Sequence, residues 1–280
     1  VLSNSFGGNA YRLKLHDAQN RVHELNKKAA QLARQEADAV DRPVIVAGSM
    51  GPTGEIFEPV GTLTHDQGVA AFAEQAQALE AGGADVLWIE TISSEEEFRS
   101  ALEGARTTAL PVVATMSFDT NGRTMMGLTP AAYAALAAAQ QSAPDAIGAN
   151  CGTGAAELVA TVLGMTEADG NATVVAKGNC GIPVWVDGHI RYDGTPELMA
   201  DYARLALDSG AKIIGGCCGT TYEHVRAMRT ALEAYSGGAR PTVEQVEAKL
   251  GKVSALAHGT DTAAEGAARR GREGRGRRRG

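Results

Sequence analysis

The chain has 280 residues, a formal net charge of −7, 44% hydrophobic residues and four cysteines. This composition fits one large globular domain or two modest ones, and it excludes collagen-like, mucin-like and wholly disordered chains. Because seven arginines fall within residues 269–280, the rest of the chain is strongly acidic, which argues against nucleic acid as a specific partner.

Short β-branched runs recur along the chain, and each is followed by an Ala-rich segment with helical periodicity. The expected strands are residues 44–47, 86–91, 112–117, 146–150, 173–177 and 212–216. The expected helices include residues 66–81, 94–108, 130–141, 196–209 and 222–235. Several of these helices open with a cap signal, such as Thr195 before Pro196.

Apolar strands that alternate with helices predict a parallel sheet covered on both faces, either an open doubly wound sheet or a closed (β/α)8 barrel. The opening VLSNSF reads as the end of a further strand and residues 16–39 as its helix, which gives seven βα units where a barrel needs eight. We therefore predict an α/β fold, a (β/α)8 TIM barrel over residues 1–237 that lacks its first βα unit. Residues 238–258 are predicted to form a C-terminal extension with a last helix at 242–250. Residues 259–280 are predicted to be a disordered Arg/Gly-rich tail.

Compartment and membrane association follow from two absences in the sequence. No apolar run approaches the roughly 20 residues of a membrane span, and the N-terminus has no secretion signal. We expect a cytoplasmic protein with no membrane partner. Four cysteines in a chain of this length are typical of reduced thiols or thiolate ligands and not of a secreted disulfide framework.

The polar residues that follow the strands are the candidates for chemistry, because the carboxyl ends of parallel strands meet on one face. These are Glu90, Asn150 with Cys151, Asn179 with Cys180, and the adjacent pair Cys217 and Cys218. Three thiolates from two separate loops match the tetrahedral habit of zinc and leave one position open, as in a catalytic site. Glycines on both sides of the cysteine pair permit the sharp turn that would direct both sulfurs to one ion.

Each candidate also has a plainer interpretation. A buried cysteine is often just a small apolar residue, and this is the favoured reading of Cys180, with a fourth thiol ligand as its alternative. A disulfide between Cys217 and Cys218 would close a strained ring. Glu90 either caps the following helix or binds a cationic group such as a substrate ammonium.

With these motifs the sequence resembles the homocysteine S-methyltransferase family. The resemblance rests on GANCG and IIGGCCGTT, and it extends through SNSFGGNAYRL, AGSMGPTGE, LWIETISS and GNCGIPVW, over roughly residues 1–234. The family signature is a cysteine after the sixth barrel strand and GGCCG after the eighth. Family members begin with a strand that carries an Asp-Gly-Gly or Asp-Gly-Ala motif, and nothing in this chain matches it.

The resemblance implies a site and a reaction. It assigns Zn²⁺ to Cys151, Cys217 and Cys218, the amino group of homocysteine to Glu90, and the lining of the site to Asn150 and Asn179. Zinc coordination lowers the pKa of a thiol, so a homocysteine thiolate would take a methyl group from a small onium donor and give methionine. Aromatic faces suit an onium group, and the candidates for this role are Phe6, Trp88, Phe118 and Trp185.

The methyl donor is favoured to be betaine, with S-methylmethionine or another methylated donor as the alternative. Betaine-using animal members carry a tyrosine at the positions of Gly7 and Thr91, which is a departure in this chain. Two alternatives of other classes stay open, a non-catalytic zinc-binding barrel and a thiol redox protein. The oligomeric state is left open as well, with a homo-oligomer among the choices.

Overall fold

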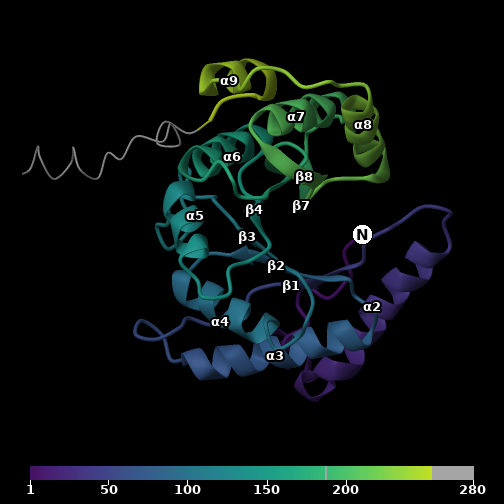
Figure 1. Ribbon diagram of the computed structural model, residues 1–280, viewed down its shortest axis with the longest axis vertical. Helices are drawn as coiled ribbons and strands as arrows, with labels where there is room; N and C mark the ends of the chain where they lie inside the picture. The colour runs from purple at the N-terminus through teal and green to yellow at the C-terminus, as the bar shows by residue number, and fades with distance from the viewer. Residues whose placement is uncertain (187, 254–280) are drawn as a thin grey trace, which may run out of the picture.

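The computed structural model describes residues 1–186 and 188–253, in which strands and helices alternate along the chain (Figure 1). The strands are β1 (Ala47–Met50), β2 (Val86–Ile92), β3 (Val112–Met116), β4 (Ala146–Cys151), β5 (Val174–Gly178), β6 (Pro183–Val186), β7 (His189–Tyr192) and β8 (Ala211–Gly216). The α-helices are α1 (Ala10–Leu13), α2 (Val22–Asp38), α3 (His65–Ala81), α4 (Glu95–Ala105), α5 (Pro130–Ala138), α6 (Ala155–Ala168), α7 (Pro196–Asp208), α8 (Tyr222–Glu233) and α9 (Val243–Leu250). Two short 3-10 helices cover Lys14–His16 and Gln19–Arg21.

Six strands form one parallel sheet in the order β1-β2-β3-β4-β5-β8, and the helices lie on its outer side (Figure 1). This is the predicted α/β arrangement of the (β/α)8 barrel type. Among the described residues the sheet does not close, because β8 pairs only with β5 and β1 has only an isolated bridge from Leu2 to Ala47 on its other side. The predicted strand at VLSNSF is therefore reduced to this single bridge.

The helix starts follow the cap signals in the sequence. Thr64 and Gln67 form a capping box at α3, and a threonine caps both α5 and α7 immediately before a proline in their first turn. The first predicted strand was misplaced by three residues. β1 runs from Ala47 to Met50 and not over 44–47, since the parallel register with β2 begins at Ala47 and the Val46 amide donates to the Asp85 side chain.

The strands place two different cores on their two faces. The outer face packs against the helices through a large apolar cluster that includes Leu79, Leu87 and Phe98. The inner face carries a small apolar cluster near the strand starts, formed by Ala47, Trp88, Val113, Ala146 and Val175. Two or four residues further along the same strands, the inward positions are Ser49, Glu90, Thr115, Asn150 and Lys177, which we call the inner polar layer. The interior thus changes from apolar to polar toward the carboxyl ends of the strands.

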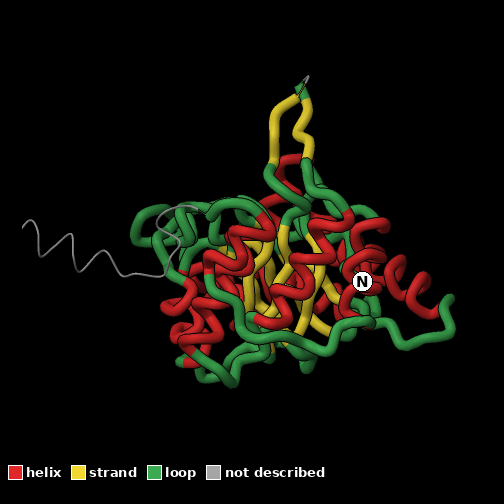
Figure 2. Tube along the Cα trace, turned by 90° about the horizontal axis from the view of Figure 1, so that it is seen from above, coloured by secondary structure: helices red, strands yellow, loops and turns green. Residues whose placement is uncertain are grey.

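A β-hairpin that the sequence analysis did not predict lies between β5 and α7. Strands β6 and β7 pair antiparallel with Trp185 opposite Ile190, and the hairpin projects from the rest of the molecule (Figure 2). Both of these side chains are exposed. The sequence between 183 and 192 lacks the long apolar run of the other strands, and the hairpin contributes nothing to the six-stranded sheet.

The predicted last helix at 242–250 is confirmed as α9, which lies against α6 and α7 and buries Val246 and Leu250. The predicted C-terminal extension, residues 238–258, therefore packs on the barrel helices as far as residue 253. Its last residues, 254–258, and the predicted tail, 259–280, lie outside the described residues. Among the helices of the described residues, none has the length and hydropathy of a membrane-spanning segment.

Candidate metal centre and substrate site

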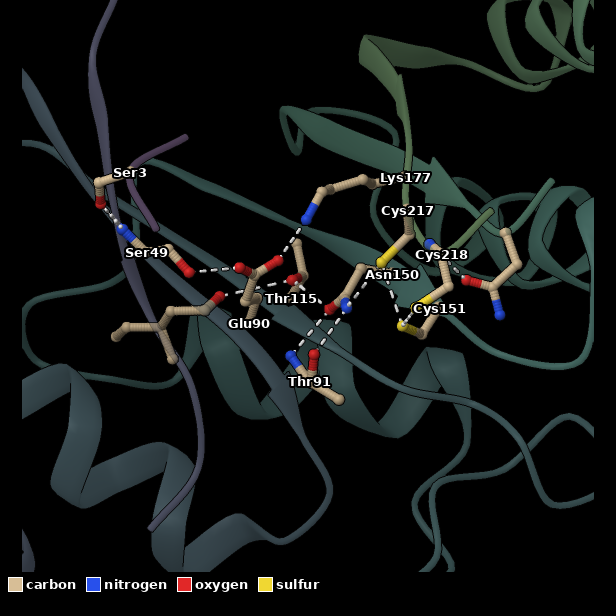
Figure 3. A network of polar contacts seen from close by, with 12 residues as sticks. Ser3, Ser49, Glu90, Thr91, Thr115, Asn150, Cys151, Lys177, Cys217 and Cys218 are labelled. Atoms are coloured by element: carbon tan, nitrogen blue, oxygen red, sulfur yellow. Dashed lines mark hydrogen bonds and ion pairs between the residues drawn. The ribbon is translucent and has the colours of Figure 1, made fainter. Parts of the chain in front are cut away.

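The structure brings together the three cysteines that the sequence singled out as metal ligands. Cys151 is the last residue of β4, and Cys217 and Cys218 directly follow β8. The Cys151 sulfur lies 3.1 Å from that of Cys217 and 3.7 Å from that of Cys218. All three sulfurs lie within 4.8 Å of one another, although 66 residues separate Cys151 from Cys217. Figure 3 shows the three side chains pointing toward one another.

The backbone at both loops is shaped to make this approach. Cys151 has a φ of 59°, in the left-handed region that a residue with a Cβ rarely adopts. Gly219 has a φ of 77°, and a Cβ there would lie 2.4 Å from the Tyr192 ring, so only glycine fits. The Asn179 side chain joins the two loops, because it donates to the Gly152 carbonyl at 2.8 Å and accepts from the Cys218 amide at 3.0 Å.

The donor set fits a metal ion of the zinc type. Three sulfurs at about 2.3 Å from one ion lie about 3.8 Å apart in a tetrahedron, close to the separations found. The pKa of Cys151 is raised, chiefly by its hydrogen bond with Cys217, whereas the pKa of Cys218 is lowered, chiefly by its hydrogen bond with Cys151. Thiolate sulfur is the kind of ligand that a thiophilic cation such as zinc prefers.

Cys180 lies outside this cluster. Its thiol is buried and donates to the Gly194 carbonyl at 3.3 Å, while its amide donates to the Cys218 carbonyl at 2.9 Å. The favoured reading of Cys180 as a packing residue agrees with this position. The structure gives no support to its alternative role as a fourth thiol ligand, because it is not among the cysteines that converge.

Glu90 lies in the inner polar layer and is buried, with both carboxylate oxygens engaged (Figure 3). The Ser49 hydroxyl donates to one oxygen at 2.5 Å, and the Lys177 ammonium forms an ion pair with the other. Glu90 is therefore not the cap of the following helix, whose N-cap is Ser94. Its pairing with an ammonium is the kind of contact that was expected, but in this structure the ammonium belongs to the protein.

Lys177 was missed by the sequence analysis. Burial lowers the pKa of Lys177, but the charges of Glu90 and Cys217 outweigh this effect, so the pKa is raised and the side chain stays an ammonium. The sequence feature that could have identified Lys177 is its place at the end of the apolar run TVVAK, where a lysine would point to the inside of the sheet. A charged residue there is rarely buried unless it is paired.

Asn150 is fully buried and holds neighbouring strands together. Its side-chain oxygen accepts from the Thr91 amide at 2.8 Å and from the Thr115 hydroxyl at 2.6 Å, and its nitrogen donates to the Thr91 hydroxyl at 2.7 Å. The same nitrogen lies 4.0 Å from the Cys217 sulfur. Asn150 thus borders the cysteine cluster. Its two hydrogen bonds to Thr91 hold that residue in a left-handed backbone conformation, with a φ of 66°.

Most of the aromatic residues proposed for an onium group are placed elsewhere. Phe118 is buried in the outer core against Tyr133, and Trp88 is buried in the inner apolar cluster. Trp185 is 73% exposed on the projecting hairpin. Phe6 is partly exposed and packs on Gly51. The structure therefore gives no ready aromatic cage among these four residues.

Tyr192 is a second site residue that the sequence analysis missed. It ends β7, and its ring packs on Gly219, the residue after Cys218. Burial, followed by the nearby Cys218 thiol, raises the pKa of Tyr192 to about 12. The hairpin base is thus linked to the metal-ligand loop.

The fold and the site together define a class of protein, a parallel α/β barrel-type fold with three converging cysteines, suited to hold a metal ion, at the carboxyl ends of its strands. The sequence profile of the family described as homocysteine S-methyltransferase matches residues 1–232. The chain belongs to this family of methyltransferases.

Two methionine synthases are similar in sequence. That of Mycobacterium tuberculosis is 31% identical over 245 residues, which are 83% of this chain and 20% of that protein. That of Mycobacterium leprae is 29% identical over 255 residues, which are 88% of this chain and 21% of that protein. The chain therefore spans about a fifth of the length of these curated relatives.

Solved structures of the homocysteine methyltransferase MmuM from Escherichia coli share the fold. Its oxidized and metallated forms each match with a TM-score of 0.66 at 22% identity, over 82% of this chain and 78% of theirs. This similarity agrees with the barrel-type arrangement of strands and helices described above.

Proposed function

We propose that this protein is a zinc-dependent homocysteine S-methyltransferase that takes its methyl group from a small onium donor, with betaine favoured. The observation that carries the proposal is the convergence of Cys151, Cys217 and Cys218 in a chain of this family. Their sulfurs would hold Zn²⁺ and leave one position for a substrate sulfur. When bound, zinc lowers the pKa of a coordinated thiol, so that a thiolate is present at neutral pH.

The protein's own residues prepare and hold the site. Asn179 fixes the two cysteine loops relative to each other, and Asn150 holds the strand ends below them. Glu90 offers its carboxylate to the ammonium of homocysteine from within the inner polar layer, whose Asn150 borders the cysteines (Figure 3). These contacts restrict the position of the substrate sulfur, which is the chief contribution that a protein makes to a displacement at carbon.

The proposed transfer is a single displacement with a simple balance of bonds. The sulfur of homocysteine forms a bond to a methyl carbon of betaine while the bond from nitrogen to that carbon breaks. Dimethylglycine leaves with the bonding electron pair, and the thiol proton passes to solvent. The donor's positive charge disappears in the transition state, which favours a site that excludes water.

Zinc content and methionine formation test this proposal. The purified chain is expected to hold about one zinc ion and to form methionine from homocysteine with betaine, while S-methylmethionine serves as the competing donor. Cys217→Ala is expected to lose both zinc and activity, because two thiolates do not retain the ion. Cys180→Ala is the matched control and should keep both, since its thiol lies outside the cluster.

Two results would contradict the proposal. Bound zinc and homocysteine with no methionine from any onium donor would indicate a non-catalytic zinc-binding barrel. A reversible disulfide that forms under mild oxidants in the zinc-loaded protein would favour a thiol redox role. The cytoplasmic location and the oligomeric state stay predictions that these measurements do not address.

We also propose that a further βα unit belongs beside β8 and completes the barrel. The interior-facing Ile213 is 37% exposed, and β8 pairs on one side only among the described strands. The donor assay is therefore performed on residues 1–280 and on a longer chain that carries an added upstream βα unit with an Asp-Gly-Gly turn. Activity that requires the added unit would support this proposal.

A further inference from the structure

Lys177 is the one cationic side chain of the inner polar layer, and it is not one of the three candidate metal ligands. Its side chain is 14% exposed and its partner Glu90 is 6% exposed, so the pair is largely removed from water. In the sheet register Lys177 is level with Asn150 on β4 and with Gly215 on β8. It therefore lies on the strand next to both strands that carry the cysteines, and Figure 3 shows its ammonium pointing to Glu90.

The neighbouring position on β8 is open. A Cβ built at Gly215 would meet no heavy atom within 4 Å, and Gly215 precedes Cys217 by two residues on the inward face. Glycine at this inward position therefore leaves open space next to Lys177 in the sheet register and two residues before Cys217.

The chemistry of homocysteine fits this arrangement of charges. Its ammonium and carboxylate are attached to the same carbon, so a group that binds the ammonium brings the carboxylate close to itself. A neutral ion pair can accept a neutral zwitterion and leave no buried charge without a partner. A substrate with the ammonium alone would displace Lys177 from Glu90 and leave the lysine unpaired.

We infer that Lys177 binds the α-carboxylate of homocysteine while Glu90 binds its ammonium, so that the pair selects thiols that are zwitterionic amino acids. This inference rests on the proposed function. In the absence of substrate, the two side chains bind each other. When substrate enters, each side chain exchanges its partner for the complementary group of the substrate, and the number of ion pairs rises from one to two.

Binding of three thiols to the zinc-loaded protein tests the inference by isothermal titration calorimetry. Homocysteine carries both charged groups, 3-aminopropanethiol lacks the carboxylate, and 4-sulfanylbutanoate lacks the ammonium. The wild-type protein is expected to bind homocysteine about 10- to 100-fold more tightly than 3-aminopropanethiol, the range of one hydrogen bond between charged groups. In Lys177→Met this ratio should fall below about threefold, because only homocysteine loses a contact.

Two further variants separate substrate binding from folding. Lys177→Arg keeps the charge and should restore most of the preference for homocysteine over 3-aminopropanethiol. The double variant Glu90→Gln with Lys177→Met leaves no single charge buried, so it should fold, bind zinc and discriminate little among the three thiols. Thermal unfolding and zinc content of each variant are measured alongside.

The outcomes are distinct. If Lys177→Met weakens homocysteine and 3-aminopropanethiol equally, Lys177 serves only to neutralise Glu90 and the inference is wrong. An increase in the KM for betaine with unchanged homocysteine binding would assign Lys177 to the donor's carboxylate, which also overturns the inference. If the wild-type protein binds none of the thiols, the proposed function fails together with it.

Discussion

Replacement of Asn150 by alanine is expected to destabilise the protein by about 3 kcal/mol. The side chain is fully buried and makes three hydrogen bonds of 2.6 to 2.8 Å, two to Thr91 and one to Thr115. The loss of each such hydrogen bond lowers the free energy of unfolding by about 1 kcal/mol. Two of these bonds hold the left-handed backbone of Thr91 in place, and the three losses together give the expected total.

The free energy of unfolding is measured by guanidinium titration of the wild-type, Asn150→Ala and Thr115→Val proteins. Thr115→Val keeps the side-chain shape and removes the 2.6 Å bond to Asn150 together with a longer one, 3.4 Å, to the Ile89 carbonyl, so it should cost about 1 kcal/mol. The dependence on denaturant concentration should be unchanged in both variants. A loss in Asn150→Ala no larger than that in Thr115→Val would refute the reasoning, because the two bonds to Thr91 would then contribute nothing.

The same variant is expected to weaken zinc binding. Asn150 lies 4.0 Å from the Cys217 sulfur and fixes the strand end that bears Cys151, so its loss changes the support of two ligands. Removal of groups that orient metal ligands typically costs 10- to 100-fold in affinity. Competition with a chromogenic chelator measures this change. If the zinc affinity is unaltered while the stability falls, Asn150 stabilises the fold but does not support the metal ligands.

Two smaller predictions concern Asp145 and Tyr192. Burial raises the pKa of Asp145, but the hydrogen bond from the Val112 amide and the nearby guanidinium of Arg106 outweigh it, so the pKa is lowered in the folded state. The carboxylate therefore stabilises the protein above the unfolded pKa of about 3.9, and this contribution is lost as pH falls through the folded pKa. Because the side chain is half exposed, Asp145→Asn should cost under about 1 kcal/mol at pH 7, and urea titrations should show the difference shrinking as the pH falls below the unfolded pKa of about 3.9. Tyr192→Phe keeps the ring but removes the hydroxyl near Cys218, so the zinc affinity should fall about tenfold in chelator competition with little change in melting temperature. Unchanged affinity would show that this hydroxyl does not support the metal site.

The sequence predicts the sheet well because its strands are buried on both faces, and such strands are near-continuous apolar runs. It predicts β1 less well, because the β-branched Val-Ile-Val run at 44–46 indicates a strand that begins before Ala47. The register with β2 instead places the strand on the small residues that follow, including Gly48, which packs against Leu79. The pairing of β1 with β2 sets this boundary, and that long-range pairing cannot be read from a single sequence.

The hairpin of β6 and β7 had a signal that was passed over. An Asp-Gly pair at 187–188 between short runs of alternating residues is a strong sign of a two-residue hairpin turn. The strands beside it are mostly exposed and contain Pro183, so they do not resemble the buried strands of the sheet. Tyr192 was missed for the same reason, because its place beside Cys218 depends on this hairpin.

The cysteine cluster was predictable and the charged pair was not, for a physical reason. Two adjacent cysteines between glycines are rare as packing residues, so their composition alone indicates ligands. Glu90 and Lys177 are 87 positions apart and neither is unusual by itself. Their meaning appears only when the register places both at inward positions of one barrel layer.

The pair and the cysteine cluster also depend on each other electrostatically. Without Lys177 the buried carboxylate of Glu90 would have no cationic partner, and an unpaired negative charge near the three thiols would disfavour their ionisation. The positive charge of Lys177 instead stabilises the carboxylate and lowers the pKa of Cys218, whose larger causes are its hydrogen bonds with Cys151 and Cys217. An apolar residue at position 177 would therefore weaken the metal site and the substrate site together. This coupling explains why a lysine is placed at the inward end of an otherwise apolar strand.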